Sequence, residues 1–414
     1  MPQNLQTFDA ALKETYGPGL RNAVNDKATV VWAEACKNTD DLIGEEAVWA
    51  VHSGRSNSTG ARGESTNLPV ANNQRHLKAR KGLTFQYHTI KVSGPAKHLT
   101  RGDEGAFARA LETEIKGAER DIKNDMARQA FGQTVSSTSP VARYTGVIGT
   151  VSSVTSTTLL FAGEDESIMR HFFLGESIQV FSSTTGTIRA GGPYEITGIN
   201  KATRTVTVGT TLGGTVAATD WVARGDAGSN SLNSEIDGLR TLISPIGSYA
   251  GLDPANTGNA SWASLLIGSA TTGVSEVIFD EAAEVVETDG DGNTPELFVS
   301  EFVQRRKLAS LLQAQKRYDG REVTLTSGWK GLQLARGTLV ADRYCPTTYA
   351  FGIHQPELTK FVGLDFQWDE DDGTVLYKSL DGQDSVEARY KAYVQLAVTN
   401  RNSHVQIRLS APSF

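Results

Sequence analysis

The feature that most constrains the fold is a pair of strand-like runs separated by a long polar stretch. Residues 47–51 and 83–90 are rich in apolar, β-branched and aromatic side chains, whereas the stretch between them is rich in Gly, Ser, Asn and Arg. This arrangement predicts a long hairpin with an extended tip. An isolated hairpin is only marginally stable in water, so this one needs a partner surface.

The hairpin region is also basic within an acidic chain. No Asp or Glu occurs between Glu64 and Asp103, and the formal net charge of the whole chain is −7. This net charge argues against a dedicated nucleic-acid binder and favours an acidic protein surface as the partner of the basic stretch. We therefore expect a subunit interface at the basic residues of this stretch, which are Arg75, Lys78, Arg80, Lys81, Lys91, Lys97 and Arg101.

Residues 103–132 give the clearest helical pattern in the chain. Apolar side chains recur there at spacings of three and four, which places them on one face of a helix. A helix of this length spans roughly 40 Å, longer than most globular helices. The stripe consists of Phe107, Leu111, Ile115, Ala118, Ile122 and Met126.

The composition changes at residues 134–140, which are mostly Ser and Thr. From there to Asp226 the chain is rich in Gly and β-branched residues, with strands expected at 146–155, 177–182, 194–200 and 205–209. This pattern predicts a small β-sandwich or barrel inserted into a host domain. Residues 226–230 would lead back to the host.

The rest of the chain mixes helices and strands, so the expected fold class is α+β. One helix is expected to follow Thr272 and Gly273 and to be ended by residues 289–290, and a second is expected to be capped by Ser300 and to run to Leu312. Strands are expected at 296–299, 323–327, 337–341, 375–379 and 387–399, with a return strand at 404–409.

Catalytic and cofactor motifs are missing from the sequence. It contains no GxxxxGK[ST], HExxH or GxSxG pattern, and Ser327 and Lys330 match SxxK without the SDN and KTG motifs that accompany it in serine enzymes. The two cysteines, Cys36 and Cys345, are far apart and lack metal-binding spacing. We expect a protein that is not an enzyme and has no cofactor.

Metal-binding patterns are also incomplete. Residues 289–293 resemble the start of an EF-hand loop, but Thr294 replaces the glycine at the sixth position and Ser300 the glutamate at the twelfth. An acidic run at 369–373 is typical of a solvated hairpin turn. The histidines near the hairpin have no neighbouring carboxylates, so we expect no metal site and expect these residues to be exposed or interfacial; they are His52, His76, His88 and His98.

The order of parts is an arm, a long basic hairpin, a long helix, a mixed α/β part and closing strands. This order resembles the major capsid protein of tailed bacteriophages, whose fold is shared with encapsulins and the herpesvirus capsid floor. Four segments are also similar to that family, namely residues 232–239, 297–300, 336–346 and 392–402. The resemblance covers nearly the whole chain apart from the insert.

The resemblance implies a division of the chain into named parts. These are an N-terminal arm (1–45), the E-loop hairpin (46–99), the spine helix of the peripheral domain (100–134), the inserted β-domain (135–226), the return to the peripheral domain (227–248), the axial domain (249–357) and the closing strands of the peripheral domain (358–414).

The resemblance also implies a function. The chain would be a structural subunit that self-assembles into hexamers and pentamers of an icosahedral shell around packaged double-stranded DNA. Its acidic charge would keep contact with DNA on the inner face weak. The expected partners are further copies of the chain, a separate scaffolding protein and a portal, and the expected location is the virion, assembled in host cytoplasm. No run approaches the roughly 20 apolar residues of a membrane helix, so no membrane contact is expected.

Some members of this family cross-link their subunits through a hairpin lysine and a neighbour's asparagine, assisted by a glutamate. The matching types here are Lys78 and Lys81 in the hairpin and Asn400 and Asn402 near the C-terminus. The placement of Glu387 does not fit the family pattern, so the sequence disfavours cross-linking.

Two other hypotheses about the function remain open from the sequence alone. An encapsulin-like cellular compartment would use the same fold to enclose an enzyme. A β-rich phage adhesin or glycan-binding protein would instead use the insert as its functional centre, with aromatic contacts from residues such as Tyr144, Phe173 or Trp221.

Overall fold

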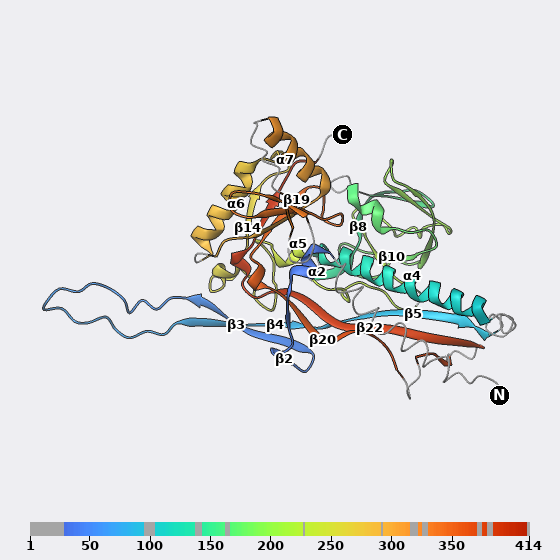
Figure 1. The fold of residues 1–414 in the computed structure, drawn as a ribbon, viewed down its shortest axis with the longest axis horizontal. Coiled ribbons are helices and arrows are strands. Elements are labelled where there is room, and N and C mark those ends of the chain that lie inside the picture. Colours follow the sequence, from blue (N-terminus) through green and yellow to red (C-terminus); the bar gives the residue numbers. More distant parts are fainter. Residues whose placement is uncertain are drawn as a thin grey trace.

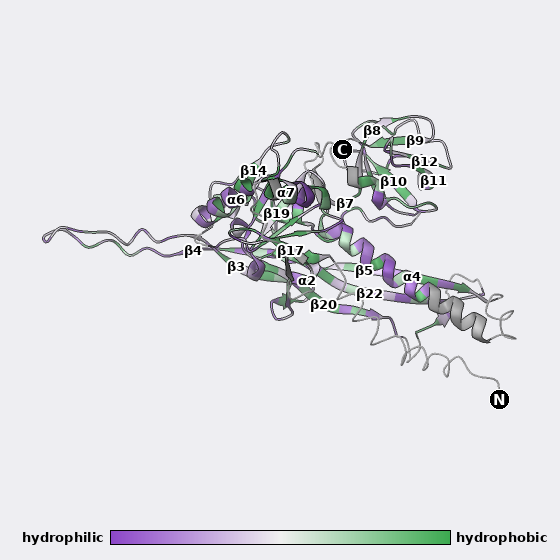
Figure 2. Ribbon diagram, turned by 45° about the horizontal axis from the view of Figure 1, so that its top comes forward, coloured by the Kyte–Doolittle hydropathy of each residue, from purple (hydrophilic) through white to green (hydrophobic). Residues whose placement is uncertain are grey.

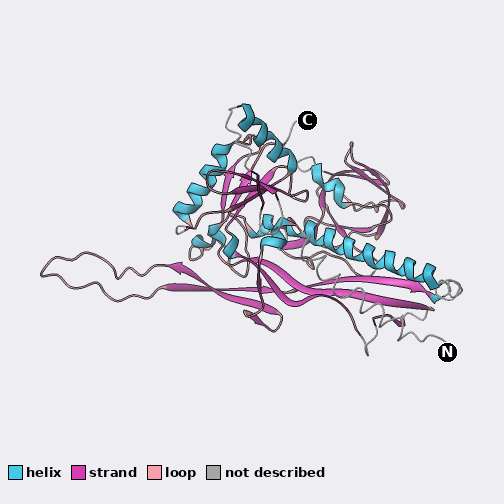
Figure 3. Ribbon diagram, viewed as in Figure 1, coloured by secondary structure: helices cyan, strands magenta, loops and turns pink. Residues whose placement is uncertain are grey.

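The computed structural model describes residues 29–94, 104–136, 143–161, 166–226, 228–290, 293–314, 322–324, 330–370, 375–378 and 384–411. Helices and strands are mixed along the chain, as the α+β prediction requires (Figure 3). A long sheet runs beneath the helix α4, a second sheet and a barrel lie on the α4 side of it, and a hairpin projects beyond the sheet (Figure 1). Within these residues, no helix combines the length and apolarity that a membrane crossing requires.

The long sheet and α4 form the centre of the molecule. In the sheet, β22 pairs with β20, β21 and β5, and β1 pairs in parallel with β20. The strands are β1 (Cys36–Asn38), β5 (Thr84–Ser93), β20 (Leu358–Trp368), β21 (Tyr377–Lys378) and β22 (Ser385–Val398). The helix α4 (Glu104–Ala130) shows alternating hydrophilic and hydrophobic residues in the part that Figure 2 colours by hydropathy. Its described apolar side chains, including Ile115 and Ile122, are buried, which confirms the apolar face expected there.

The second sheet has seven strands in the order β14-β23-β19-β15-β18-β17-β16. Their bounds are β14 (Leu265–Gly268), β15 (Leu297–Ser300), β16 (Glu322–Thr324), β17 (Lys330–Gln333), β18 (Thr338–Ala341), β19 (Tyr349–Ile353) and β23 (Val405–Arg408). Two helices, α6 (Glu276–Asp289) and α7 (Phe302–Ala314), pack their apolar residues on it.

This sheet corrects the expected division of the C-terminal residues. We expected 358–414 to supply closing strands to the peripheral part alone, but β23 pairs with β14 and β19 in the seven-stranded sheet. The turn that follows β22, including η5 (Arg401–Ser403), carries the chain from one sheet to the other.

A closed barrel occupies the middle of the chain, in the strand order β10-β11-β12-β9-β8-β13. The strands are β8 (Gly149–Val154), β9 (Thr158–Phe161), β10 (Ser177–Phe181), β11 (Tyr194–Asn200), β12 (Thr205–Val208) and β13 (Trp221–Arg224), with η2 (Glu166–His171) between β9 and β10. The buried residues of its core all lie between Ile148 and Val222, so the barrel has a core of its own.

A two-stranded ribbon, β6 (Gln133–Ser136) and β7 (Arg143–Val147), connects α4 to the barrel. The run expected as one strand over 146–155 is therefore split at Ile148 between two sheets. Gly146 has a positive φ of 83° and lies against the backbone of Ser231, an approach that a side chain would block.

The hairpin corrects a strand assignment. The strand that pairs with β3 (Glu46–Gly54) is β4 (Arg75–Gly82), whereas the expected partner, residues 83–90, belongs to β5 and pairs with β22. The short strand β2 (Leu42–Ile43) pairs on the other edge of β3. The sequence does not predict a strand at β4, because only Leu77 and Ala79 are apolar there and both face inward. The expected E-loop hairpin of 46–99 therefore ends at Gly82.

Short helices complete the fold. They are α2 (Val30–Glu34), α5 (Leu239–Leu242), η3 (Ala260–Trp262) and η4 (Gln355–Glu357). The start of α7 differs from expectation, because Glu301 rather than Ser300 accepts a hydrogen bond from the first-turn backbone, at Val303 N–H (2.6 Å). Ser300 instead ends β15.

Candidate subunit-interface surface

The root of the hairpin is anchored on the body of the chain through its inward face. Alternation along the strands directs odd-numbered residues inward, and Ala47 and Ala79 are fully buried. The indole Nε1–H of Trp49 donates to the carbonyl of Thr399 (3.0 Å), and its ring stacks on Phe361 with centroids 5.6 Å apart. The two strands therefore leave the body in a fixed direction.

Beyond this root, residues 55–74 form an extended tip without strand pairing. The tip projects away from every other part of the molecule in Figure 1. Its apolar residues Leu68 and Val70 are 82% and 86% exposed. Hydrogen bonds inside the tip join Ser56 Oγ–H to the carbonyl of Asn72 (2.7 Å) and the Asn72 amide to Asn57 Oδ1 (2.8 Å). The tip thus has local bonding but no core.

The basic residues expected at an interface divide between two faces of the hairpin. Lys78 and Arg80 lie on the outward face and are exposed. Lys81 points inward, and its Nζ lies 2.5 Å from the carboxylate of Asp237, which is 4% exposed. The guanidinium of Arg75 packs over the loop at Gly258.

The remaining basic residues lie outside the hairpin. Lys91 is exposed on β5, opposite Glu387 of β22. Lys97 and Arg101 lie outside the described residues, as does the arm before Thr29. Among the seven residues expected at an interface, Lys78 and Arg80 are therefore the two that lie on the outward face of the hairpin.

The side chains considered for a cross-link lie apart in the chain. Asn400 and Asn402 flank or lie in η5, just after β22 ends, whereas Glu387 lies near the other end of that strand. About 35 Å of extended strand separates the two ends. Lys81 is held in its ion pair with Asp237, and Lys78 is the exposed lysine of the pair.

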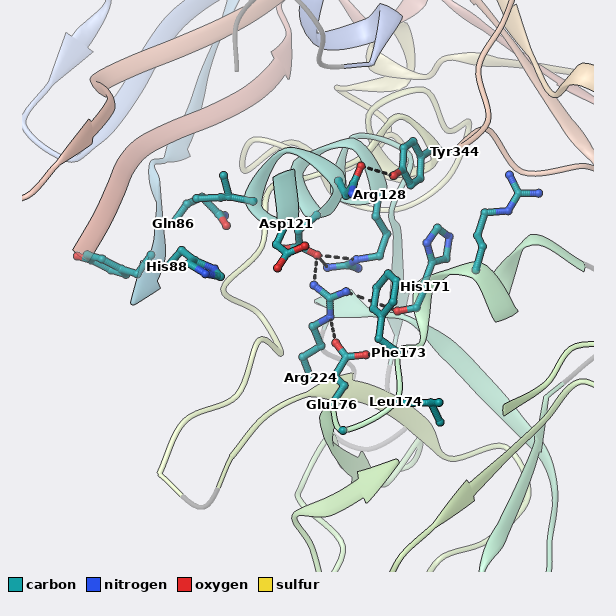
Figure 4. Close-up of a pocket in the computed structure, with 16 residues that line it drawn as sticks. Gln86, His88, Asp121, Arg128, His171, Phe173, Leu174, Glu176, Arg224 and Tyr344 are labelled. Atoms are coloured by element: carbon teal, nitrogen blue, oxygen red, sulfur yellow. Dashed lines mark hydrogen bonds and ion pairs between the residues drawn. The ribbon is translucent and has the colours of Figure 1, made fainter. Parts of the chain in front are cut away.

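A buried charge network between α4, the barrel and the return segment was not visible in the sequence. Arg128 of α4 contacts Glu235 (2.5 Å) and Asp125 (3.0 Å). Arg224 of β13 contacts both Asp125 and Glu176, and Figure 4 shows Arg128, Arg224 and Glu176 close together. Asp125 and Arg128 lie one turn apart on α4, but Glu176, Arg224 and Glu235 come from distant segments, and the five residues form no sequence motif. Their packing fixes the barrel against α4.

Burial and opposite charges act against each other in this network. Burial alone would raise the pKa of the Asp125 carboxyl, but Arg128 and Arg224 outweigh burial and hold that pKa below its ordinary value. For Glu235 burial outweighs Arg128, so its pKa is raised. Burial, together with nearby Arg128, holds the pKa of His171 well below its ordinary value, so this ring is neutral.

A cleft of about 610 Å³ lies beside the network (Figure 4). Its walls carry charges of both signs, with Asp121 and Glu176 facing Arg170 and Arg224. The exposed Phe173 lies at its edge. The lining carries three acidic and three basic side chains, so neither sign of charge is in excess.

No group of three or more His, Cys, Asp or Glu side chains in the described ranges is placed to hold a metal ion. The loop with EF-hand similarity is only partly described, since 291–292 lie outside the described residues, and so do 371–373 and 325–329 of the other two motifs. Asp369, at the start of the acidic run, pairs with Lys391 (2.5 Å).

The three aromatic residues considered for glycan contact do not form one surface. Trp221 is 4% exposed and packs beside Tyr144, with ring centroids 5.6 Å apart. Phe173 alone among the three is exposed, and it lies at the cleft beside α4.

Solved structures resemble the whole chain. It is similar to the subunit of the cyanophage A-1(L) capsid, with a TM-score of 0.54 and 11% identity over 92% of each chain. The capsid of the native GTA particle (TM-score 0.45, 9% identity, 94% and 91% coverage) and the SrpI encapsulin of Synechococcus elongatus (0.44, 8%, 94% and 91%) are also similar. No family model and no curated protein sequence matches the chain.

The likeness to the cyanophage subunit extends over nearly all of both chains, and it agrees with the order of parts that the sequence predicts. At this level of identity the likeness establishes the fold. The chain therefore has the fold of tailed-bacteriophage capsid subunits.

Proposed function

We propose that this chain is a major capsid protein, a structural subunit that self-assembles into hexamers and pentamers of an icosahedral shell enclosing double-stranded DNA. The observation that carries the proposal is the projecting hairpin tip at residues 55–74. Ordering a residue costs roughly 1–2 kcal/mol of backbone entropy, which the few hydrogen bonds within the tip do not offset. A neighbouring subunit would supply the missing contacts for Leu68 and Val70.

The proposed partners are further copies of the chain, a separate scaffolding protein and a portal. The formal net charge of −7 supports weak contact with packaged DNA on the inner face. The proposed location is the virion, after assembly in the host cytoplasm. A structural role fits the cleft beside α4, whose charged groups pair with one another and are not directed at a substrate.

The central test compares the intact chain with a variant lacking the tip. In this variant an Asn-Gly turn joins Arg55 to Gln74, a connection suited to a two-residue hairpin. Negative-stain electron microscopy should show closed shells for the intact chain and free subunits for the variant. Matching urea midpoints would confirm that the variant folds. If the intact chain stays monomeric under all conditions, with scaffold included, the proposal fails.

An encapsulin-like compartment would pass that test, so the contents of the shell separate the two functions. Particles purified from their source should contain double-stranded DNA, which nuclease treatment after disruption would identify. A protein cargo in place of DNA would favour the compartment.

The adhesin hypothesis and the capsid hypothesis predict different effects of removing residues 137–226. Loss of particle stability with no change in glycan-array signal supports a capsid protein. A glycan signal that disappears with the insert supports an adhesin.

A further inference from the structure

Two histidines face each other across the hairpin where the paired strands end. His52 of β3 and His76 of β4 are register partners, and both lie on the outward, exposed face. Their ring centroids are 5.3 Å apart, with the planes inclined by 50°. The sequence separates them by the whole hairpin tip, so no short motif indicates the pair.

The spacing of the rings suits a shared metal ion. Zinc binds imidazole nitrogen at about 2.0–2.1 Å with tetrahedral angles, which places two ligand rings with centroids about 5 Å apart. The observed separation matches this value without movement of the backbone. Cross-strand partners are also held by the hydrogen bonds of the ladder, so the two rings are already brought together before a metal binds.

A hydrogen bond selects the nitrogen of His52 that is free to bind. The backbone N–H of Ser56 donates to Gln74 Oε1 (3.2 Å), which identifies that atom as the amide oxygen. The same oxygen lies 2.9 Å from His52 Nε2, so Nε2 must carry the hydrogen that is donated. The lone pair of His52 is then on Nδ1. Such a bond from the second ring nitrogen to an oxygen is the usual outer-shell support of a metal-binding histidine.

The surroundings define the class of metal. Among the described residues, no Asp, Glu or Cys joins the two histidines in a metal-binding group of three, and Ca²⁺ or Mg²⁺ would require oxygen ligands. Neutral imidazole suits Zn²⁺, Ni²⁺ and Cu²⁺. Lys78 lies on the same face with Arg80 beyond it, whereas Arg75 turns inward, so the nearby positive charge weakens the site without blocking it.

We propose that His52 and His76 form a two-histidine site for Zn²⁺, Ni²⁺ or Cu²⁺, with water completing the coordination. The ion joins β3 to β4 at the point where strand pairing stops and the tip begins. It therefore stiffens the base of the tip. This site does not depend on the proposed function, because it is complete within one chain.

The test uses the untagged full chain and zinc chloride titrated in a calorimeter at pH 7.5. The intact chain should bind one Zn²⁺, and His52→Ala and His76→Ala should each weaken that affinity at least tenfold. Lys78→Ala is the matched control on the same face and should bind at least as tightly as the intact chain. Circular dichroism should be the same for all four proteins, because each substituted side chain is exposed.

A further readout identifies the ligands. Electron paramagnetic resonance of one Cu²⁺ per chain should show coupling to two nitrogen nuclei, and to one nitrogen in either alanine variant. Unchanged binding in both alanine variants, or no binding by the intact chain, would overturn the proposal.

Discussion

At the scale of single residues, the direction in which a basic side chain of β4 points decides whether it anchors the hairpin to the body of the chain or is exposed to solvent. Lys81 points inward to Asp237, whereas Lys78, three residues earlier on the same strand, points to solvent. The amide of Gln395 also contacts Asp237, so the carboxylate is held from two sides at the hairpin root. This environment makes Lys81 a structural residue of the single subunit.

Replacing Lys81 by methionine should therefore destabilise the chain. The change keeps most of the side-chain volume but leaves the buried Asp237 carboxylate without its cation, which should cost about 2–3 kcal/mol. Lys78→Met is the matched control and should change stability by less than about 0.5 kcal/mol. Urea unfolding of the unassembled subunit measures both. Equal effects would show that the ion pair contributes little.

His404 supplies a pH-dependent contribution to stability. It is fully buried, its Nδ1 accepts from the backbone N–H of His354 (3.2 Å), and burial lowers its pKa to about 3. Below the ordinary pKa of about 6.5 the unfolded chain binds a proton that the folded chain does not. Stability is therefore unaffected above pH 6.5 and falls as the pH drops below it.

The expected loss from His404 is about 2 kcal/mol between pH 6.5 and pH 5. In His404→Gln this contribution disappears, so unfolding free energy should fall less steeply over the same range. The comparison uses differences between two pH values, which removes any constant cost of the substitution. Parallel pH profiles for the two proteins would contradict the assignment.

At the scale of elements, the barrel is the part most able to stand alone. Its six strands close on themselves, which leaves no open sheet edge, and its core uses its own residues. The ion pair between Arg224 and Asp125 joins the barrel to α4 from outside this core.

Residues 147–225 expressed alone should consequently fold. We expect dispersed amide signals in a nuclear magnetic resonance spectrum and a cooperative urea transition. Val222→Asp, which places a carboxylate at a fully buried position, should abolish both and is the internal control. A collapsed spectrum for the unsubstituted fragment would mean that the barrel needs α4 to fold.

At the scale of the whole molecule, the outward basic face of the hairpin should set the strength of assembly. Lys78→Glu reverses one exposed charge on this face and should reduce shell yield in light scattering at low salt. At 0.1 M salt, charges are screened over about 10 Å. The difference in shell yield between Lys78→Glu and the intact chain should therefore shrink as the salt concentration rises. Lys201→Glu, in an exposed turn of the barrel, carries the same charge change and should assemble normally. Equal yields for all three proteins would place the interface elsewhere.

The sequence predicted elements where local pattern and packing agree. The apolar stripe of α4 identified that helix because one face of it packs on a sheet, and the strand-like run within β22 is apolar because that strand is largely buried. The prediction from sequence missed the strand β4, whose polar residues face solvent on one side. It was also wrong about the cap of α7, where Glu301 and not Ser300 accepts the hydrogen bond from the first turn.

The sequence by itself determined the order of parts and hence the capsid fold, because helix and strand periods are local properties of the chain. Tertiary structure alone decided which strands pair, since register depends on contacts between residues hundreds of positions apart, such as β5 with β22. It also decided which basic residue is buried against Asp237 and which two histidines meet. The sequence indicates that the hairpin needs a partner surface. The pairing of β3 with β4 determines which face of the hairpin is exposed to such a partner.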